Sequence, residues 1–192
     1  MFLRLWGLLG IYSWGAATYS MPPRDVVIRG ITWAQVGACA VFQALENGAY
    51  LAGRGIIGWD KKTVARAWVW SSRAWMAHVA LEITRLGYEW RQLKGEEYGR
   101  KNKGVRNEQK AADEGEVVEE KGELELRVEM VEEERVRERW GRWLRELGVN
   151  TAYAPMTVHY SLEEGPLGEG SLGALGVVVG WLSIGRAWKA SA

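Results

Sequence analysis

Two long stretches without a charged side chain constrain the fold of this chain more than any other feature. The first is Ile31–Leu45 and the second is Gly170–Gly185. In the first run and its extension, the polar residues recur at helical spacing and form one narrow stripe on an apolar helix. The run is shorter than the roughly 20 residues that span a bilayer. This pattern predicts either a core helix or a membrane helix whose stripe faces a partner. The stripe comprises Thr32, Gln35, Gln43, Glu46 and Tyr50.

The second uncharged run predicts a short, glycine-rich membrane helix near the end of the chain. Small residues let two membrane helices approach closely, so we expect helix–helix contact through Gly173, Gly176 and Gly180. Aromatic and basic side chains follow, and such residues anchor helix ends at a membrane surface. The predicted anchors are Trp181, Arg186, Trp188 and Lys189. With its charged end reaching the lipid surface, this helix approaches spanning length.

The opening segment, Met1–Tyr19, is apolar apart from Arg4 and allows two interpretations. A basic start followed by an apolar run and small residues is typical of a signal peptide. The Trp and Tyr residues within the run favour instead a helix that lies in a membrane surface. In that interpretation the membrane-inserting residues are Leu5, Trp6, Leu9, Ile11 and Trp14.

A long helix is predicted over Lys61–Leu93, because polar and apolar residues both recur there at spacings of three, four and seven. It is either an ordinary bundle helix or a helix beside a membrane with Trp at the interface. The chain has 12 Trp against 2 Phe, which favours an interface, since Trp combines an apolar body with a polar N–H. Asp25, after Pro22 and Pro23, is expected to cap the helix that contains Ile31–Leu45.

Between these apolar parts, residues 94–139 are strongly charged, first basic and then acidic. Large apolar residues are scarce until Leu124, so the charge density predicts a largely disordered insert. Its part Gly95–Gly122 is expected to be mobile and dispensable for membrane attachment. The predicted organisation is therefore membrane-associated helices in residues 1–93, the insert in 94–139, and a final helix with a membrane anchor in 140–192.

The sequence contains no convincing catalytic, cofactor-binding or metal-binding motif. His78 and His159 lie on separate segments, and there is no nucleophile elbow, phosphate-binding loop or dinucleotide fingerprint. A single cysteine, Cys39, excludes an intramolecular disulfide, and a net charge of +1 does not suggest a nucleic-acid partner. We therefore expect an all-α membrane protein with amphipathic helices, with no cofactor and no enzymatic activity.

Three stretches together resemble the peroxisomal biogenesis factor 11 (peroxin 11) family, most closely its filamentous-fungal members. They are Ala40–Ile57, Trp68–Leu86 and Asn150–Ala192, and their most characteristic phrases are FQALENGAYL, WSSRAWMAHV and GWLSIGRAWKA. With the opening LRLWGLLGIYSW, they cover most of the chain outside the insert. Family members usually carry further helical sequence before this opening, so part of the amphipathic region is expected to be missing here.

The resemblance implies a protein of the peroxisomal membrane that promotes membrane elongation and fission, that is, peroxisome proliferation. It implies amphipathic helix insertion into membrane lipids, self-association into a homo-oligomer, and recruitment of the fission adaptor and a dynamin-related GTPase. A second hypothesis is an oligomeric pore or metabolite channel, which Gln35, Gln43 and Glu46 would line. A third is a secreted helical protein with a cleaved leader.

Overall fold

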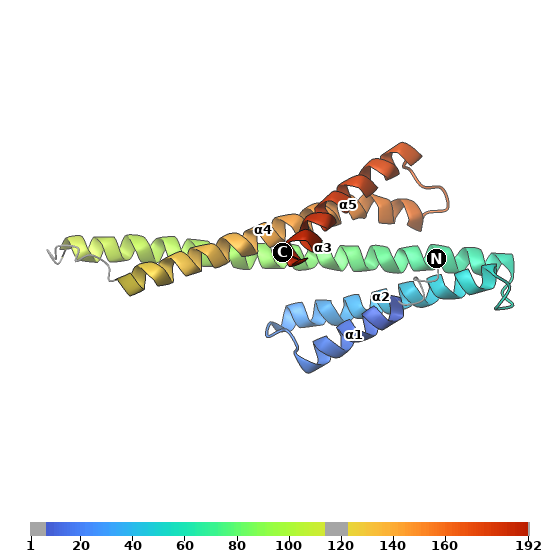
Figure 1. Ribbon diagram of the computed structural model, residues 1–192, viewed down its shortest axis with the longest axis horizontal. Helices are drawn as coiled ribbons and strands as arrows, with labels where there is room; N and C mark the ends of the chain where they lie inside the picture. Colours follow the sequence, from blue (N-terminus) through green and yellow to red (C-terminus); the bar gives the residue numbers. More distant parts are fainter. Residues whose placement is uncertain (1–6, 114–122, 192) are drawn as a thin grey trace. The chain divides into compact units, whose positions relative to one another are not determined.

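A computed structural model of the chain describes the backbone of residues 7–113 and 123–191, and nearly all of it is helical. Within those ranges there are five α-helices and no strand (Figure 1). The prediction of an all-α chain is confirmed. The helices are α1 (Gly7–Ser20), α2 (Val26–Gly53), α3 (Lys61–Asp113), α4 (Glu123–Ser161) and α5 (Glu169–Ser191).

The chain divides into two compact units, and two of the helices contribute to both. The first unit consists of Met1–Arg85 together with Gly148–Ala192, and the second consists of Leu86–Leu147. The first therefore holds α1, α2, α5, the beginning of α3 and the end of α4. The second is a pair of helical arms formed by the rest of α3 and α4.

Aspartates begin the two helices that form the centre of the first unit. The carboxylate of Asp25 accepts hydrogen bonds from the backbone N–H groups of Val27 and Ile28, at 2.8 and 3.1 Å. The predicted cap of α2 is thus confirmed. Asp60 plays the same part for α3, and its carboxylate accepts from the N–H of Thr63 at 3.0 Å. Hydrogen bonds from Thr63 hold the pKa of the Asp60 carboxyl below its usual value.

A tight reversal ends α2 and leads into α3. Gly55 adopts a left-handed conformation with φ of 75°, and its N–H donates to the carbonyl of Ala52. The N–H of Ile56 reaches back to the carbonyl of Leu51 at 3.0 Å, which completes a Schellman motif. The loop then places the Trp59 indole directly on Gly48, where an added Cβ would lie 2.5 Å from Trp59 Cη2.

Aromatic side chains join the helices of the first unit. Trp75 of α3 lies with its ring centroid 6.3 Å from that of Phe42 on α2 and 5.4 Å from that of Tyr153 on α4. The α5 side chain Leu182 packs on Gly148 of α4, because its Cδ1 would be 3.2 Å from a Cβ there. Large rings thus pack against one another, and the missing side chain of a glycine lets a neighbouring helix approach closely.

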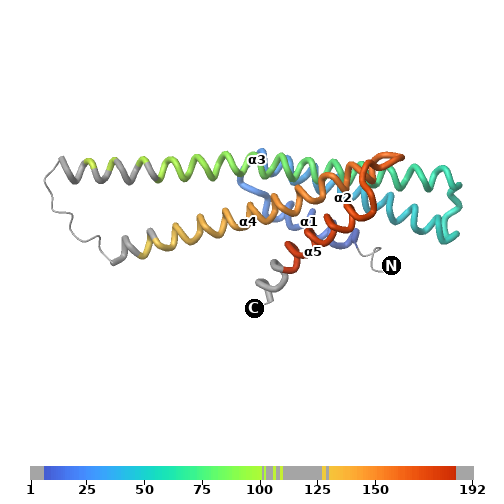
Figure 2. Tube along the Cα trace, turned by 90° about the horizontal axis from the view of Figure 1, so that it is seen from above, coloured from blue at the N-terminus to red at the C-terminus, as the bar shows by residue number. Residues whose placement is uncertain are grey.

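In the second unit, α3 and α4 run antiparallel (Figure 2). The indole N–H of Trp143 donates to the backbone carbonyl of Leu86 at 2.8 Å. Further along the pair, Arg139 Nη1 lies 2.6 Å from Glu96 Oε2, and Arg100 Nη1 lies 4.0 Å from Glu133 Oε1. Residues later in α3 thus contact residues earlier in α4. Both ion pairs are exposed, so they contribute little to stability compared with the half-buried indole.

The predicted insert differs from what the structure describes. The charge density of residues 94–139 predicts disorder, whereas α3 continues to Asp113 and α4 begins at Glu123. Glu, Lys and Arg are good helix formers, and charges three or four apart support one another, as Lys94 and Glu97 do at 3.9 Å. Residues 114–122, part of the segment predicted to be mobile, lie outside the described residues. The predicted division into three parts stays a prediction.

Candidate membrane interface

The interior of the first unit is unusually polar. Gln35 of α2 is only 2 % exposed, and most of the other buried residues of this unit are also polar. Only small patches of apolar side chains, such as Ala49 and Val79, share this interior. The predicted stripe of α2 is thus the buried face of that helix. The buried polar residues of this unit are Thr18, Gln35, Gln43, Glu46, Asn47, Ser71, Asn150, Thr157 and Ser161.

The exterior of the same unit is apolar. Large hydrophobic side chains point outward from every helix, and Trp181 of α5 is the extreme case among the tryptophans, at 79 % exposed. A water-soluble protein of this size rarely exposes so much apolar surface. Exposed members on α2, α3 and α5 include Val26, Val27, Trp33, Val41, Trp68, Trp70, Ile83, Val177, Val178, Trp181 and Ile184.

Polar groups inside and apolar groups outside are the arrangement expected in lipid, where water cannot satisfy an exposed polar group. Among the described residues, α2 is the one helix long and apolar enough to cross a membrane, and only 11 % of its most apolar window is buried within the molecule. The core helix of a soluble protein would be mostly buried. A shorter apolar helix runs from Glu169 to Ile184 within α5.

A charged network joins α2 to α3 in this interior. The Gln35 amide donates to the carboxylate of Glu82, and Arg85 Nε donates to the same carboxylate oxygen at 3.0 Å. The Glu82 and Arg85 side chains are 16 % and 19 % exposed. Pairing compensates for the cost of removing both charges from water. Two turns further along α2, Gln43 donates to the side chain of Asn47 at 2.9 Å.

His78 of α3 lies beside this network and packs against α1. The Trp14 ring of α1 meets its imidazole edge to face, with centroids 6.2 Å apart. Its Nδ1 is buried and has no hydrogen-bond partner among the described residues. The described residues contain no cluster of three potential metal ligands. The surroundings of His78 are those of a packing residue between helices.

The structure separates the residues predicted to insert into a membrane. Leu9 is 54 % exposed on the outer side of α1, next to exposed Leu8. Ile11 and Trp14 are half-buried and face the other helices. Gly7 and Gly15 share that inner face, against Gln43 and Val36 of α2. The other two predicted residues, Leu5 and Trp6, lie outside the described residues.

The glycines predicted to mediate helix contact lie on open parts of α5. Nothing lies within 4 Å of a Cβ built at Gly173, Gly176 or Gly180. Their small faces are therefore not used for packing in the described chain. Of the predicted anchors, Trp181 is exposed, whereas Arg186, Trp188 and Lys189 lie outside the residues whose side chains are described.

Several outward tryptophans were not singled out by the sequence reasoning. Trp70 is exposed on α3, and the guanidinium carbon of Arg73 lies 5.1 Å from its ring centroid. Trp33 and Trp59 are also exposed. The signal that pointed to them was the excess of Trp over Phe, which indicates an interface but not which tryptophans form it.

The family model for peroxisomal biogenesis factor 11 (PEX11) matches residues 3–188. The chain belongs to the peroxisomal biogenesis factor 11 family. Searches of curated proteins and of solved structures returned no match.

Membership of the PEX11 family agrees with the inverted distribution of polar and apolar residues. It gives the chain the role of a peroxisomal biogenesis factor and associates it with the peroxisomal membrane. The family is not known for enzymatic activity. The match covers the segment 94–139 as well, so the charged arms belong to the family region of this PEX11 chain.

Proposed function

We propose that this PEX11 protein promotes elongation and fission of the peroxisomal membrane. The observation that carries the proposal is the inverted first unit, with buried Gln35 and half-buried Glu82 inside and exposed Val177 and Trp181 outside. A unit of this kind sits in lipid, because lipid contacts its exterior without leaving polar groups unsatisfied. From that position, helices that occupy one leaflet more than the other can bend the membrane.

The wedge is α1, through its outer side. Leu8 and Leu9 are exposed there, together with Tyr12 and Tyr19. Each buried CH₂ contributes roughly 0.8 kcal/mol, so a few large side chains hold a short helix at the interface. The inner side of α1 packs on α2, which fixes the wedge to a helix of spanning length. Insertion then expands one leaflet and favours curvature.

Self-association concentrates this effect. The open glycine face of α5, made of Gly173, Gly176 and Gly180, offers a close approach for the same helix of a second copy. Recruitment of the fission adaptor and a dynamin-related GTPase, as implied by family resemblance, would complete division of the elongated organelle.

A pore is the less favoured alternative. A pore needs polar side chains around a water-filled lumen, yet Gln35 pairs with Glu82 and Gln43 pairs with Asn47 inside one chain. Polar groups paired with one another within a protomer favour helix packing over a lumen. Purified protein in liposomes separates the two functions: membrane shaping gives tubules, whereas a pore gives release of a trapped dye.

Overexpression in cells tests the shaping function. Wild-type protein should elongate and multiply peroxisomes, counted by imaging against a matrix marker. The double variant Leu8→Glu/Leu9→Glu should elongate them less but still fractionate with membranes, because α2 and α5 remain. Its matched control, Ser13→Glu/Ser20→Glu, adds the same charge to α1 at exposed polar positions and should retain activity. A wild-type protein that changes neither number nor length would contradict the proposal.

A further inference from the structure

One stretch of α4 concentrates positive charge. Residues 135–145 read RVRERWGRWLR, with five arginines against one glutamate, so their net formal charge is +4. We call these five arginines the arginine band: Arg135, Arg137, Arg139, Arg142 and Arg145. All five lie within the second unit, and all are exposed.

The tryptophans interleaved with the band fix its orientation. Trp143 donates its indole N–H to the Leu86 carbonyl, and the Lys94 ammonium lies 5.7 Å from the Trp140 ring centroid. Both tryptophans are therefore held against α3. Since they occupy one side of α4, the arginines lie on its other sides and are exposed, with Arg139 close enough to α3 to pair with Glu96.

Little of this charge is neutralised within the protein. Arg139 pairs with Glu96, but for Arg135, Arg142 and Arg145 there is no ion pair to another described residue. Leu144, near the end of the band and next to Arg145, is 58 % exposed. The band thus combines unneutralised guanidinium groups with an apolar side chain.

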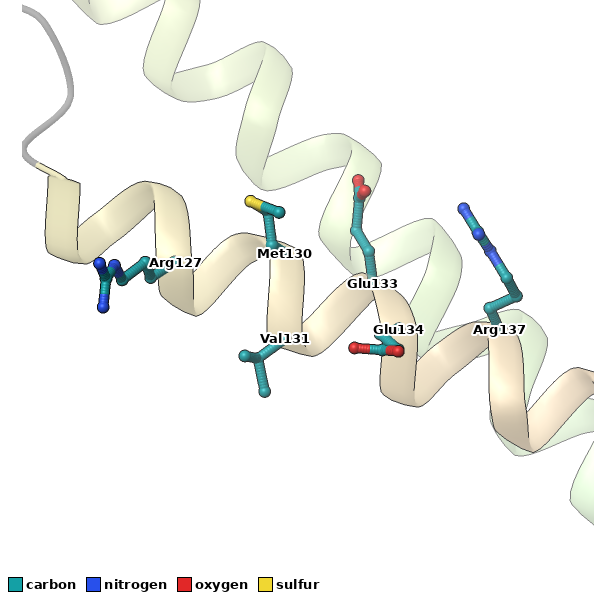
Figure 3. A pocket seen from close by; sticks show the side chains of 6 residues that line it. All are labelled: Arg127, Met130, Val131, Glu133, Glu134 and Arg137. Carbon is teal, nitrogen blue, oxygen red and sulfur yellow. The ribbon is translucent and has the colours of Figure 1, made fainter. Parts of the chain in front are cut away.

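The preceding turns of α4 differ from the band. Figure 3 shows the side chains that line a surface hollow where these turns meet the band, with Arg127 at one end and the band's Arg137 at the other. Residues 123–134 contain six glutamates and one arginine, a net formal charge of −5, so this part of α4 repels an anion. The lining residues are Arg127, Met130, Val131, Glu133, Glu134 and Arg137.

We infer that the arginine band binds the anionic headgroups of phospholipids. Guanidinium groups bind phosphate oxygens in a bidentate manner, and basic segments next to membrane helices are attracted to anionic leaflets. The band ends at Arg145, and α4 continues without a break into the first unit, which begins again at Gly148. This inference rests on the proposed membrane location of the first unit. Exposed Leu144 favours a lipid surface over an acidic protein, because it can enter the apolar layer below the headgroups.

The size of the effect follows from the number of charges. A basic side chain near an anionic leaflet contributes about 1 kcal/mol, which is about fivefold in affinity. Replacing Arg135, Arg142 and Arg145 with Gln should therefore lower the bound-to-free ratio of the band roughly 100-fold. Added salt should also lower the bound-to-free ratio, because it screens the charges and the Debye length falls to about 3 Å at 1 M.

The test uses the full chain, reconstituted in phosphatidylcholine vesicles with or without phosphatidylserine. An environment-sensitive dye is attached to Leu144→Cys in a Cys39→Ser background, and its emission is read with and without added salt. We expect a blue shift in anionic vesicles only, reversed by salt and lost in Arg135→Gln/Arg142→Gln/Arg145→Gln. The control Lys61→Gln/Lys62→Gln/Arg66→Gln removes equal charge from the exposed start of α3 and should keep the shift. Far-UV circular dichroism verifies that each variant is folded.

Emission that is the same in both lipids would overturn the inference, as would a control that loses the shift as fully as the band variant. Vesicle flotation separates this failure from failure of the proposed function. A chain that floats with both vesicle types but shows no lipid-dependent shift contradicts only the arginine band. A chain that does not float at all contradicts the membrane location itself.

Discussion

Gln35 of α2 donates a hydrogen bond to Glu82 of α3, although 47 positions separate them in the chain. The same carboxylate accepts from Arg85. One carboxylate therefore satisfies an amide from one helix and a guanidinium from its own helix. This network holds α2 and α3 in register through polar contacts, while their apolar side chains point outward.

Removing the carboxylate should destabilise the first unit. Glu82→Leu leaves Arg85 and Gln35 without this partner in a polar interior, and we expect a loss of about 2–4 kcal/mol. Glu82→Gln keeps an acceptor oxygen and should cost less. Thermal unfolding in detergent, followed by circular dichroism, measures both. Equal stability of Glu82→Leu and wild type would show that the network does not support the fold.

The contact between Gly48 and Trp59 gives a prediction for the loop between α2 and α3. Gly48→Ala places a methyl group 2.5 Å from Trp59 Cη2, so the indole must move. We expect a cost of about 1–3 kcal/mol, relieved when Trp59→Ala is combined with it. Gly37→Ala is the matched control on the same helix, where nothing lies within 4 Å. The control should gain up to about 1 kcal/mol from helix propensity. Additive effects of Gly48→Ala and Trp59→Ala would contradict the predicted contact.

The spacing of polar and apolar residues predicted those parts of the fold in which one side of a helix is polar and the other is apolar. The polar residues of α2 recur at helical spacing, and the structure places Gln35, Gln43 and Glu46 on its buried face. The cap at Asp25 was also predictable, because a short acidic side chain after two prolines has few other local roles.

Periodicity could not orient α1 or predict that α3 continues beyond Leu93. Nearly every residue of α1 is apolar or small, so no stripe distinguishes the inner Ile11 and Trp14 from the outer Leu9. In residues 94–139, the composition indicated disorder, but the described residues there are helical. They include many good helix formers, and ion pairs such as Lys94–Glu97 support the helix. Composition weighs total charge and ignores the spacing at which charges support a helix.

Self-association through α5 predicts a specific effect of bulky substitutions. Gly176→Leu/Gly180→Leu should lower crosslinking between copies in membranes at least several-fold, because Leu side chains hold the two backbones apart. The monomer should remain folded, since nothing lies within 4 Å of either glycine. Ala174→Leu adds similar bulk at an exposed position on another face of α5 and should leave crosslinking unchanged. Full crosslinking of the double variant would exclude this contact.

The outer part of the helical arms should be dispensable for membrane attachment. Arg100 Nη1 and Glu133 Oε1 lie 4.0 Å apart, so a short Gly/Ser linker can join α3 to α4 after deletion of residues 101–132. The deletion keeps the arginine band and the Trp143–Leu86 hydrogen bond, and none of the described contacts of the first unit lies within it. The protein recovered in carbonate-washed membranes should match the full-length amount, and overexpression should still elongate peroxisomes. A control chain replaces the deleted residues with a flexible Gly/Ser segment of the same length. It separates the effect of losing chain length from the effect of losing the arm sequence. If the deleted protein became soluble in the cytosol, the arms would be part of the membrane anchor, and the proposed division of the chain into anchor and charged insert would be wrong.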